Sequence, residues 1–173
     1  MSTTSEKTIE ALMSEYLTEA VSLRYSLPTI PENADQSVLL SVLQQYRANL
    51  DRLEELMVRA FIKKGIYYRR LKELQDAAQD KWDESLSKAT EKKGLSLVSQ
   101  QEFIAPKEKY ANANLATLEQ RHAVRKAENA YSWTESTSDV LLKMYRGMDS
   151  ARQDLLARIK AIPMVNSMEY TTS

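Results

Sequence analysis

The clearest pattern in this sequence is a long run of positions spaced alternately three and four residues apart, nearly all of them apolar. Its members are Leu43, Tyr46, Leu50, Leu53, Met57, Ala60, Lys64, Tyr67, Leu71, Leu74 and Ala78. A sustained period near 3.5 residues is typical of a helix in a left-handed coiled coil. With its flanks, the pattern predicts a helix from about residue 36 to 90, on the order of 80 Å long. A helix of that length needs a partner.

A second long helix is predicted after a polar interruption. Lys92, Lys93 and Gly94 break the apolar pattern, and Pro106 suits the first turn of a new helix. We expect this helix to continue without a break to about residue 162, just before Pro163. Its predicted apolar stripe consists of Trp133, Val140, Leu141, Met144, Met148, Leu155, Ile159 and Ile162.

The two long helices should pair antiparallel, because they are similar in length and are joined by a turn near residues 92–105. This pairing places Tyr131 and Trp133 close to Tyr67 and Tyr68.

The amino-terminal part predicts a shorter helix, from about residue 4 to 25. Thr3 followed by Glu6 has the spacing of a capping box at its start. Pro28 and Pro31 then exclude a regular helix and form a hinge.

The fold class that follows is all-α: a long antiparallel, coiled-coil-like hairpin with a shorter amino-terminal helix. Only three Gly and four Pro occur in 173 residues, which favours long helices over strands and turns. We expect an acidic amino-terminal segment at 1–35, the hairpin at 36–162 and a disordered tail at 163–173.

Several classes of protein are disfavoured by the composition. The chain has no Cys and therefore no disulfide framework or thiolate zinc site, and its single His122 cannot complete a di-iron site with Glu119. It has no Gly-rich phosphate loop and no nucleophile–base arrangement. Its start has acids where a signal peptide has basic residues, and no apolar run reaches the roughly 18 residues of a membrane span. We therefore expect a cytoplasmic protein that is not an enzyme, with no catalytic residue, metal or cofactor.

Charge is unevenly distributed along the chain. The chain has 24 basic and 24 acidic residues, yet the segment 58–72 has six basic residues and no acid, with Phe61, Tyr67 and Tyr68 among them. A second basic patch at 121–126 should lie opposite residues 74–79 in the hairpin. Phosphates need cations and unpaired bases need flat apolar partners, so this composition favours single-stranded nucleic acid. The predicted nucleic-acid-binding residues, forming one cationic track, are Arg59, Lys63, Lys64, Tyr68, Arg69, Arg70, Lys72, Arg121, Arg125 and Lys126.

Lys64 is the one charged residue in the predicted seam, and the sequence leaves two interpretations of it open. A polar residue in a coiled-coil core can set the register of the helices. Alternatively, Lys64 marks a defect that faces a ligand, since Gly65 beside it weakens a helix by up to about 1 kcal/mol.

A second apolar stripe is predicted on the far side of the same helix. It consists of Val58, Ile62 and Ile66, flanked by Phe61. One partner helix cannot cover both sides, so this helix should be sandwiched either between the last helix and the amino-terminal one or between its own hairpin and a neighbouring subunit. We expect these four residues to form an oligomer or partner interface, with a homo-oligomer as the first expectation.

The sequence resembles the UvsY-type recombination mediator proteins of tailed phages. The resemblance covers about residues 40 to 160: a long helix with KKGIYYRRL, a polar interruption, and a second helix with LEQRHAVRKAENAYSWTESTSDVLLKMYRGMDSARQDLLARI. It implies a helical oligomer in the host cytoplasm that binds single-stranded DNA and helps a RecA-like recombinase displace single-strand-binding protein. It also implies that DNA is contacted by Lys63, Lys64, Arg69, Arg70 and Lys72.

The alternative is a structural or adaptor protein, such as a scaffold, chaperone or inhibitory factor. In that interpretation the basic segment pairs with acidic residues at 1–35 and 73–84 of its own chain, and the second apolar stripe binds another protein.

Overall fold

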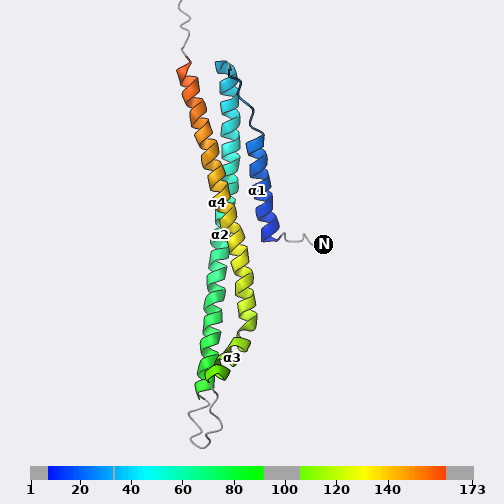
Figure 1. Cartoon of the computed structure of the whole chain (residues 1–173), viewed down its shortest axis with the longest axis vertical. Coiled ribbons are helices and arrows are strands. Elements are labelled where there is room, and N and C mark those ends of the chain that lie inside the picture. Colours follow the sequence, from blue (N-terminus) through cyan, green and yellow to red (C-terminus); the bar gives the residue numbers. More distant parts are fainter. Residues whose placement is uncertain (1–7, 33, 92–105, 163–173) are drawn as a thin grey trace, which may run out of the picture. The chain divides into compact units, whose positions relative to one another are not determined.

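The computed structural model describes residues 8–32, 34–91 and 106–162, apart from the side chains of 88–91 and 106–110. These ranges contain α1 (Ile9–Tyr25), α2 (Gln36–Glu91), α3 (Pro106–Ala116) and α4 (Leu118–Ala161), and no strand (Figure 1). The all-α prediction is confirmed, as is the packing of long helix α2 against α4 with a shorter amino-terminal helix. In the part described, no helix is long and apolar enough to cross a membrane.

The chain divides into two compact units. Unit 1 consists of Met1–Phe61 with Ser136–Ser173, and unit 2 consists of Ile62–Glu135. Unit 1 therefore contains α1, the first part of α2 and the second part of α4. Unit 2 contains the second part of α2, all of α3 and the start of α4.

The helix boundaries follow from capping residues. Thr8 has extended backbone angles (φ −60°, ψ 150°), and its Oγ1 accepts a hydrogen bond from the Ala11 N–H at 3.3 Å. The first helix therefore begins at Ile9 rather than near residue 4, and the predicted capping box at Thr3 lies outside the described residues. Asp35 caps α2 by accepting from the Val38 N–H at 2.9 Å, which lowers the pKa of its carboxyl group. The predicted turn at 92–105 and the tail at 163–173 also lie outside the description.

In unit 1 three helices share one core. Its main cluster is formed by Ala20, Leu50, Leu53, Leu56, Ala60, Leu141 and Met148. A second cluster is formed by Leu39, Val42, Leu43 and Leu155. Fully burying one such leucine stabilises the fold by about 1.5–3 kcal/mol. Every position of the predicted α2 seam, from Leu43 to Ala78, is buried or half-buried, so the 3.5-residue pattern is confirmed.

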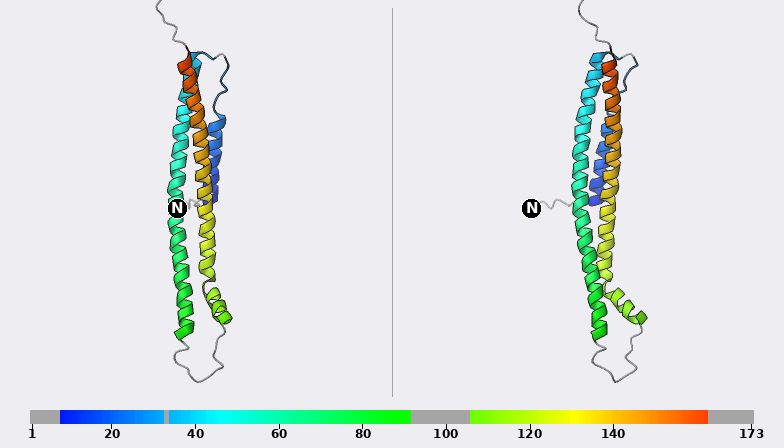
Figure 2. Two further views of the ribbon diagram at one scale, coloured as in Figure 1. Left: turned by 60° about the vertical axis from the view of Figure 1, so that its left-hand side comes forward. Right: turned by 90° about the vertical axis from the view of Figure 1, so that its left-hand side faces the viewer.

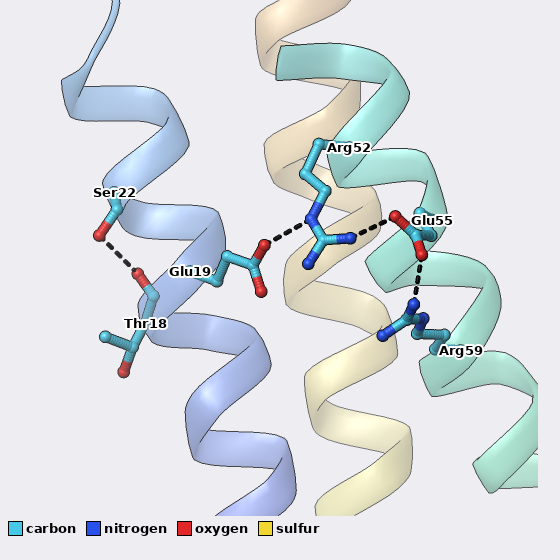
Figure 3. Close-up of polar contacts among 6 residues, drawn as sticks. All are labelled: Thr18, Glu19, Ser22, Arg52, Glu55 and Arg59. Atoms are coloured by element: carbon cyan, nitrogen blue, oxygen red, sulfur yellow. Dashed lines mark hydrogen bonds and ion pairs between the residues drawn. The ribbon is translucent and has the colours of Figure 1, made fainter. Parts of the chain in front are cut away.

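Polar contacts hold α1 against α2 in unit 1. The side-chain amide of Asn49 donates to the Leu23 carbonyl at 2.8 Å. Arg52 Nε donates to Glu19 Oε1 at 2.5 Å, and the same guanidinium also binds Glu55 (Figure 3). The acidic amino-terminal helix therefore pairs with Arg52, which precedes the predicted basic segment.

The predicted apolar stripe of the last helix is wrong at two positions. Trp133 and Val140 are 43% and 40% exposed, whereas Thr134, Thr137 and Ser138 are buried. The buried positions at 134, 141, 148 and 155 are seven residues apart, and Trp133 and Val140 each precede one of them. One residue is about 100° of helix rotation, which turns both large side chains out of the seam.

The predicted single helix from 106 to 162 is also wrong, because it is interrupted at Thr117. Thr117 is buried, and its hydroxyl donates to the Ala113 carbonyl at 2.9 Å. Such hydroxyl-to-carbonyl bonds compete with the helix ladder and bend helices. α3 consequently turns away from the direction of α4 (Figure 2).

Candidate nucleic-acid interface

Helix geometry divides the basic segment of α2 between two flanks. Arg59, Lys63 and Arg70 are separated by four and seven residues, so they lie along one flank. Lys72 is two positions after Arg70, which is a rotation of roughly 200°, and it therefore lies on the other flank. Arg69 lies between the two flanks, on the outer face. The single track expected from the sequence is thus not formed by α2.

Arg59, which belongs to unit 1, is already engaged by an acidic side chain. Its guanidinium binds Glu55, four residues earlier, and Glu55 also binds Arg52 (Figure 3). The hydrogen bond from Arg52, followed by the charges of both arginines, lowers the pKa of the Glu55 carboxyl group. Because the Glu55 carboxylate offsets its positive charge, Arg59 should attract a phosphate less strongly than the sequence suggests.

Lys64 is held by α4 within unit 2. Its Nζ is 3.1 Å from Glu135 Oε1 and 6.0 Å from the centre of the Tyr131 ring. The Tyr131 hydroxyl donates to the same Glu135 oxygen at 2.8 Å. This bond is the main cause of a raised pKa at Tyr131 and, together with Lys64, of a lowered pKa at Glu135. These contacts favour the register-setting interpretation of Lys64.

Aromatic side chains meet beside this ion pair, as expected from the antiparallel arrangement. The rings of Tyr68 and Tyr131 are 5.8 Å apart between centroids and tilted by 53°, a common geometry for aromatic pairs. Tyr68 remains 48% exposed. Its ring is therefore both anchored to α4 and accessible to a planar ligand.

A groove lies further along unit 2, between α2, the end of α3 and the start of α4. Its volume is about 480 Å³, within the usual range of ligand pockets. The lining residues are Gln75, Ala78, Gln79, Trp82, Asn114, Thr117, Arg121, Val124, Arg125 and Glu128. From the second basic patch, Arg121 and Arg125 line the groove, and the α2 residues opposite them overlap the predicted range of 74–79.

The groove continues the flank of α2 that carries Tyr68. We call this surface the groove flank; its α2 residues are separated by three or four positions, and its α4 residues line the groove. The groove flank consists of Lys64, Tyr68, Lys72, Gln75, Gln79 and Trp82 on α2, and Arg121, Arg125 and Glu128 on α4. It carries two aromatic side chains, Tyr68 and Trp82, together with cationic side chains from both helices.

The remaining predicted residues differ in their availability. Arg69, Arg70, Lys72, Arg125 and Lys126 are exposed, and Lys63 is half-buried. Arg121 is exposed as well, but its Nη2 donates to the Asn114 carbonyl at 2.8 Å. Arg125 makes no hydrogen bond or ion pair to any residue within the described ranges. Lys126, one position further on, turns away from the groove by about 100°.

Trp82, Gln75 and Gln79 were not identified from the sequence as site residues. A signal for them exists, because Phe61, Tyr68, Gln75 and Trp82 follow one another at intervals of seven residues. In a coiled coil such positions share one flank. Acidic residues become frequent after Lys72, so these positions do not stand out as part of a basic segment.

The second apolar stripe is exposed on α2. Val58, Ile62 and Ile66 are 48%, 58% and 43% exposed. Phe61 is also exposed, but it precedes Tyr68 by seven residues and shares that flank rather than the stripe. An oligomer or partner interface at this stripe stays a prediction.

No family model matches this chain, and no curated protein or solved structure matches it at a significant level. The resemblance to UvsY-type mediators therefore stays a prediction from the sequence pattern described above.

Proposed function

We propose that this protein binds single-stranded DNA without sequence preference, through the groove flank of unit 2. It is not an enzyme in this proposal. The observation that carries the proposal is the grouping of two aromatic side chains, Tyr68 and Trp82, with two exposed cations, Lys72 and Arg125, along one surface. Cations attract the phosphates and the rings accept any base, because every base has a planar face.

The dimensions of the surface suit a strand rather than a single small molecule. Tyr68 and Trp82 are fourteen residues apart on one helix, which is about 21 Å at about 1.5 Å per residue. Glu128 lies on the same surface and limits its net positive charge. Each copy should therefore bind weakly, so that a strand is held by several copies and is released easily from each.

The proposed biological role is that of a phage-type recombination mediator. In this role a homo-oligomer organises single-stranded DNA in the host cytoplasm, and a RecA-like recombinase replaces single-strand-binding protein on the strand. Support comes from the resemblance of residues 40 to 160 to UvsY-type proteins and from the long paired helices.

A matched pair of double variants tests the DNA-binding surface. Lys72→Gln with Arg125→Gln removes two charges from the groove flank, whereas Lys63→Gln with Arg70→Gln removes two charges from the opposite flank of α2. The measurement is fluorescence anisotropy of a labelled single strand at about 50 and 200 mM salt, with duplex DNA as competitor.

Each lost phosphate contact should reduce the salt slope by about 0.7 for a single strand, so the groove-flank variant should lose about 1.4. When salt rises from about 50 to about 200 mM, the affinity of the groove-flank variant should therefore fall about sevenfold less than the affinity of the unaltered protein. The opposite-flank variant should retain nearly the full slope. Equal effects of both variants, or no binding of the unaltered protein at low salt, would refute the proposal.

A second candidate function is that of a helical adaptor which binds another protein. The exposed stripe of Val58, Ile62 and Ile66 favours it, because the fold leaves three β-branched apolar side chains in water. In that case Ile62→Asp should abolish self-association or partner binding in sedimentation experiments, whereas the groove-flank variant should have no effect on either.

A further inference from the structure

We propose that the groove in unit 2 is a base-binding pocket, in which one base of the bound strand stacks on Trp82 and its phosphate binds Arg125. This inference rests on the proposed function and names the part of the surface that recognises the base. It assigns a role to Trp82, which lies outside the basic segment.

The pocket exists because the chain bends at Thr117. The Thr117 hydroxyl bonds back to Ala113, and α3 leaves the direction of α4 at this point (Figure 2). In a continuous helix the Asn114 carbonyl would accept from the Leu118 N–H; here it accepts from Arg121 Nη2 at 2.8 Å. The same guanidinium binds the side-chain oxygen of Asn114. Arg121 is therefore a positioning residue that holds the end of α3 beside the groove.

The opposite wall provides a planar surface and polar atoms. Trp82 is half-buried, with part of its side chain accessible, and the indole ring is a good stacking partner for any base. The Gln79 side-chain nitrogen donates to both carboxylate oxygens of Asp83, at 3.1 and 3.2 Å. This orients the amide, so that its oxygen is the atom which accepts from an N–H group on the edge of a base, such as N3–H of thymine.

Charge completes the pocket at the α4 side. Arg125 lines the groove and is exposed, and in the described part of the chain no acidic group pairs with it. A guanidinium binds a phosphate through two parallel hydrogen bonds. Arg125 therefore provides the anchor for the backbone of a nucleotide whose base lies against Trp82.

The chain contains two tryptophans, so the fluorescence of each can be observed alone when the other is replaced by phenylalanine. Trp133→Phe leaves Trp82 as the only tryptophan, and Trp82→Phe leaves Trp133, which is exposed on α4 outside the groove lining. Oligothymidylate should quench the fluorescence of Trp82 and change that of Trp133 little. An abasic strand with the same number of phosphates should quench neither.

Affinity provides the second readout. Trp82→Leu should weaken binding of oligothymidylate by about 5- to 140-fold, the loss expected for one base–aromatic stack, without a change in salt slope. Trp133→Leu is the matched control and should bind normally. Circular dichroism checks that both variants are helical, and Trp82→Phe, which keeps a ring, should lose less affinity than Trp82→Leu.

The outcomes separate this inference from the proposed function. Quenching of Trp82 together with the affinity loss supports the pocket. Strand binding that leaves Trp82 fluorescence unchanged and is insensitive to Trp82→Leu would overturn the pocket while the DNA-binding surface stands. Absence of strand binding by the unaltered protein at low salt would overturn both.

Discussion

The hydroxyl group of Thr137 is a buried polar group of the α4 seam, and its removal tests the packing of this helix directly. Thr137 is 1% exposed, and its Oγ1 has no hydrogen-bond partner among the residues that the structure describes. Thr134, one turn earlier, is equally buried, but its Oγ1 donates to the Tyr131 carbonyl at 2.7 Å. The same substitution by valine should therefore have opposite effects at the two positions.

The magnitudes follow from the cost of burying an unpaired polar group, about 1–3 kcal/mol. Valine has nearly the shape of threonine and a similar helix propensity, so Thr137→Val removes this cost with little other change. We expect it to raise the free energy of unfolding by about 1 kcal/mol, or Tm by about 2–4 °C. Thr134→Val loses a bond with a net value of about 0.5–1.5 kcal/mol and should lower the stability by up to about 1 kcal/mol.

The assay is urea and thermal unfolding followed by far-ultraviolet circular dichroism, with the slope of the urea transition compared between variants. Equal slopes show that the compared states are the same. A Thr137→Val protein that is less stable than the unaltered chain, or as unstable as Thr134→Val, would show that the hydroxyl of Thr137 is satisfied and that the seam is packed differently.

Three further changes have defined outcomes. Leu53→Ala, at a fully buried position of the unit 1 core, should lower the free energy of unfolding by about 2–5 kcal/mol in urea titrations; a loss below about 1 kcal/mol would contradict the core assignment. Gly147→Ala should raise Tm in a thermal melt, because an added Cβ meets no atom within 4 Å and alanine is favoured over glycine in a helix by about 0.5–1 kcal/mol; a lower Tm would contradict the open space there. The pKa of Glu135 is lowered in the folded state, so its contribution is present above the pKa of the unfolded chain and is lost as the pH falls through the folded pKa. Glu135→Gln should therefore lose less stability on acidification than the unaltered protein. The measurement is urea titration of both proteins at neutral pH and at a pH below the folded pKa of Glu135, and equal losses in the two proteins would exclude this contribution.

The long helix α2 was predicted from the sequence almost to its ends. Its 3.5-residue period is a property of consecutive positions on one helix, so Leu43, Leu53 and Leu71 identify its buried face without knowledge of the partner. The division of the basic segment between two flanks was also available from the sequence, since it follows from the spacing of Arg70 and Lys72. The density of charge along the sequence does not reveal this division, whereas the position of each residue around the helix does.

The α4 seam and the bend at Thr117 were decided by the tertiary structure. Trp133 and Val140 are larger and more apolar than Thr134 and Ser138, and hydrophobicity alone places them inside. At positions 134, 137 and 138 of α4 the buried side chains are small. The buried positions recur every seven residues, so the large side chains of Trp133 and Val140, which lie one position earlier, face outward.

The groove and the pairing of Lys64 with an acidic side chain depend on contacts between segments far apart in the chain. Glu135 and Tyr131 reach Lys64 only after α4 has paired with α2, and Arg121 meets Asn114 only because the helix bends between them. Local sequence determines which helices form and which face of α2 is apolar, because both depend on neighbouring residues. Which cations remain available to a ligand depends on the acidic and carbonyl groups that packing brings to them, and that was settled by the tertiary structure.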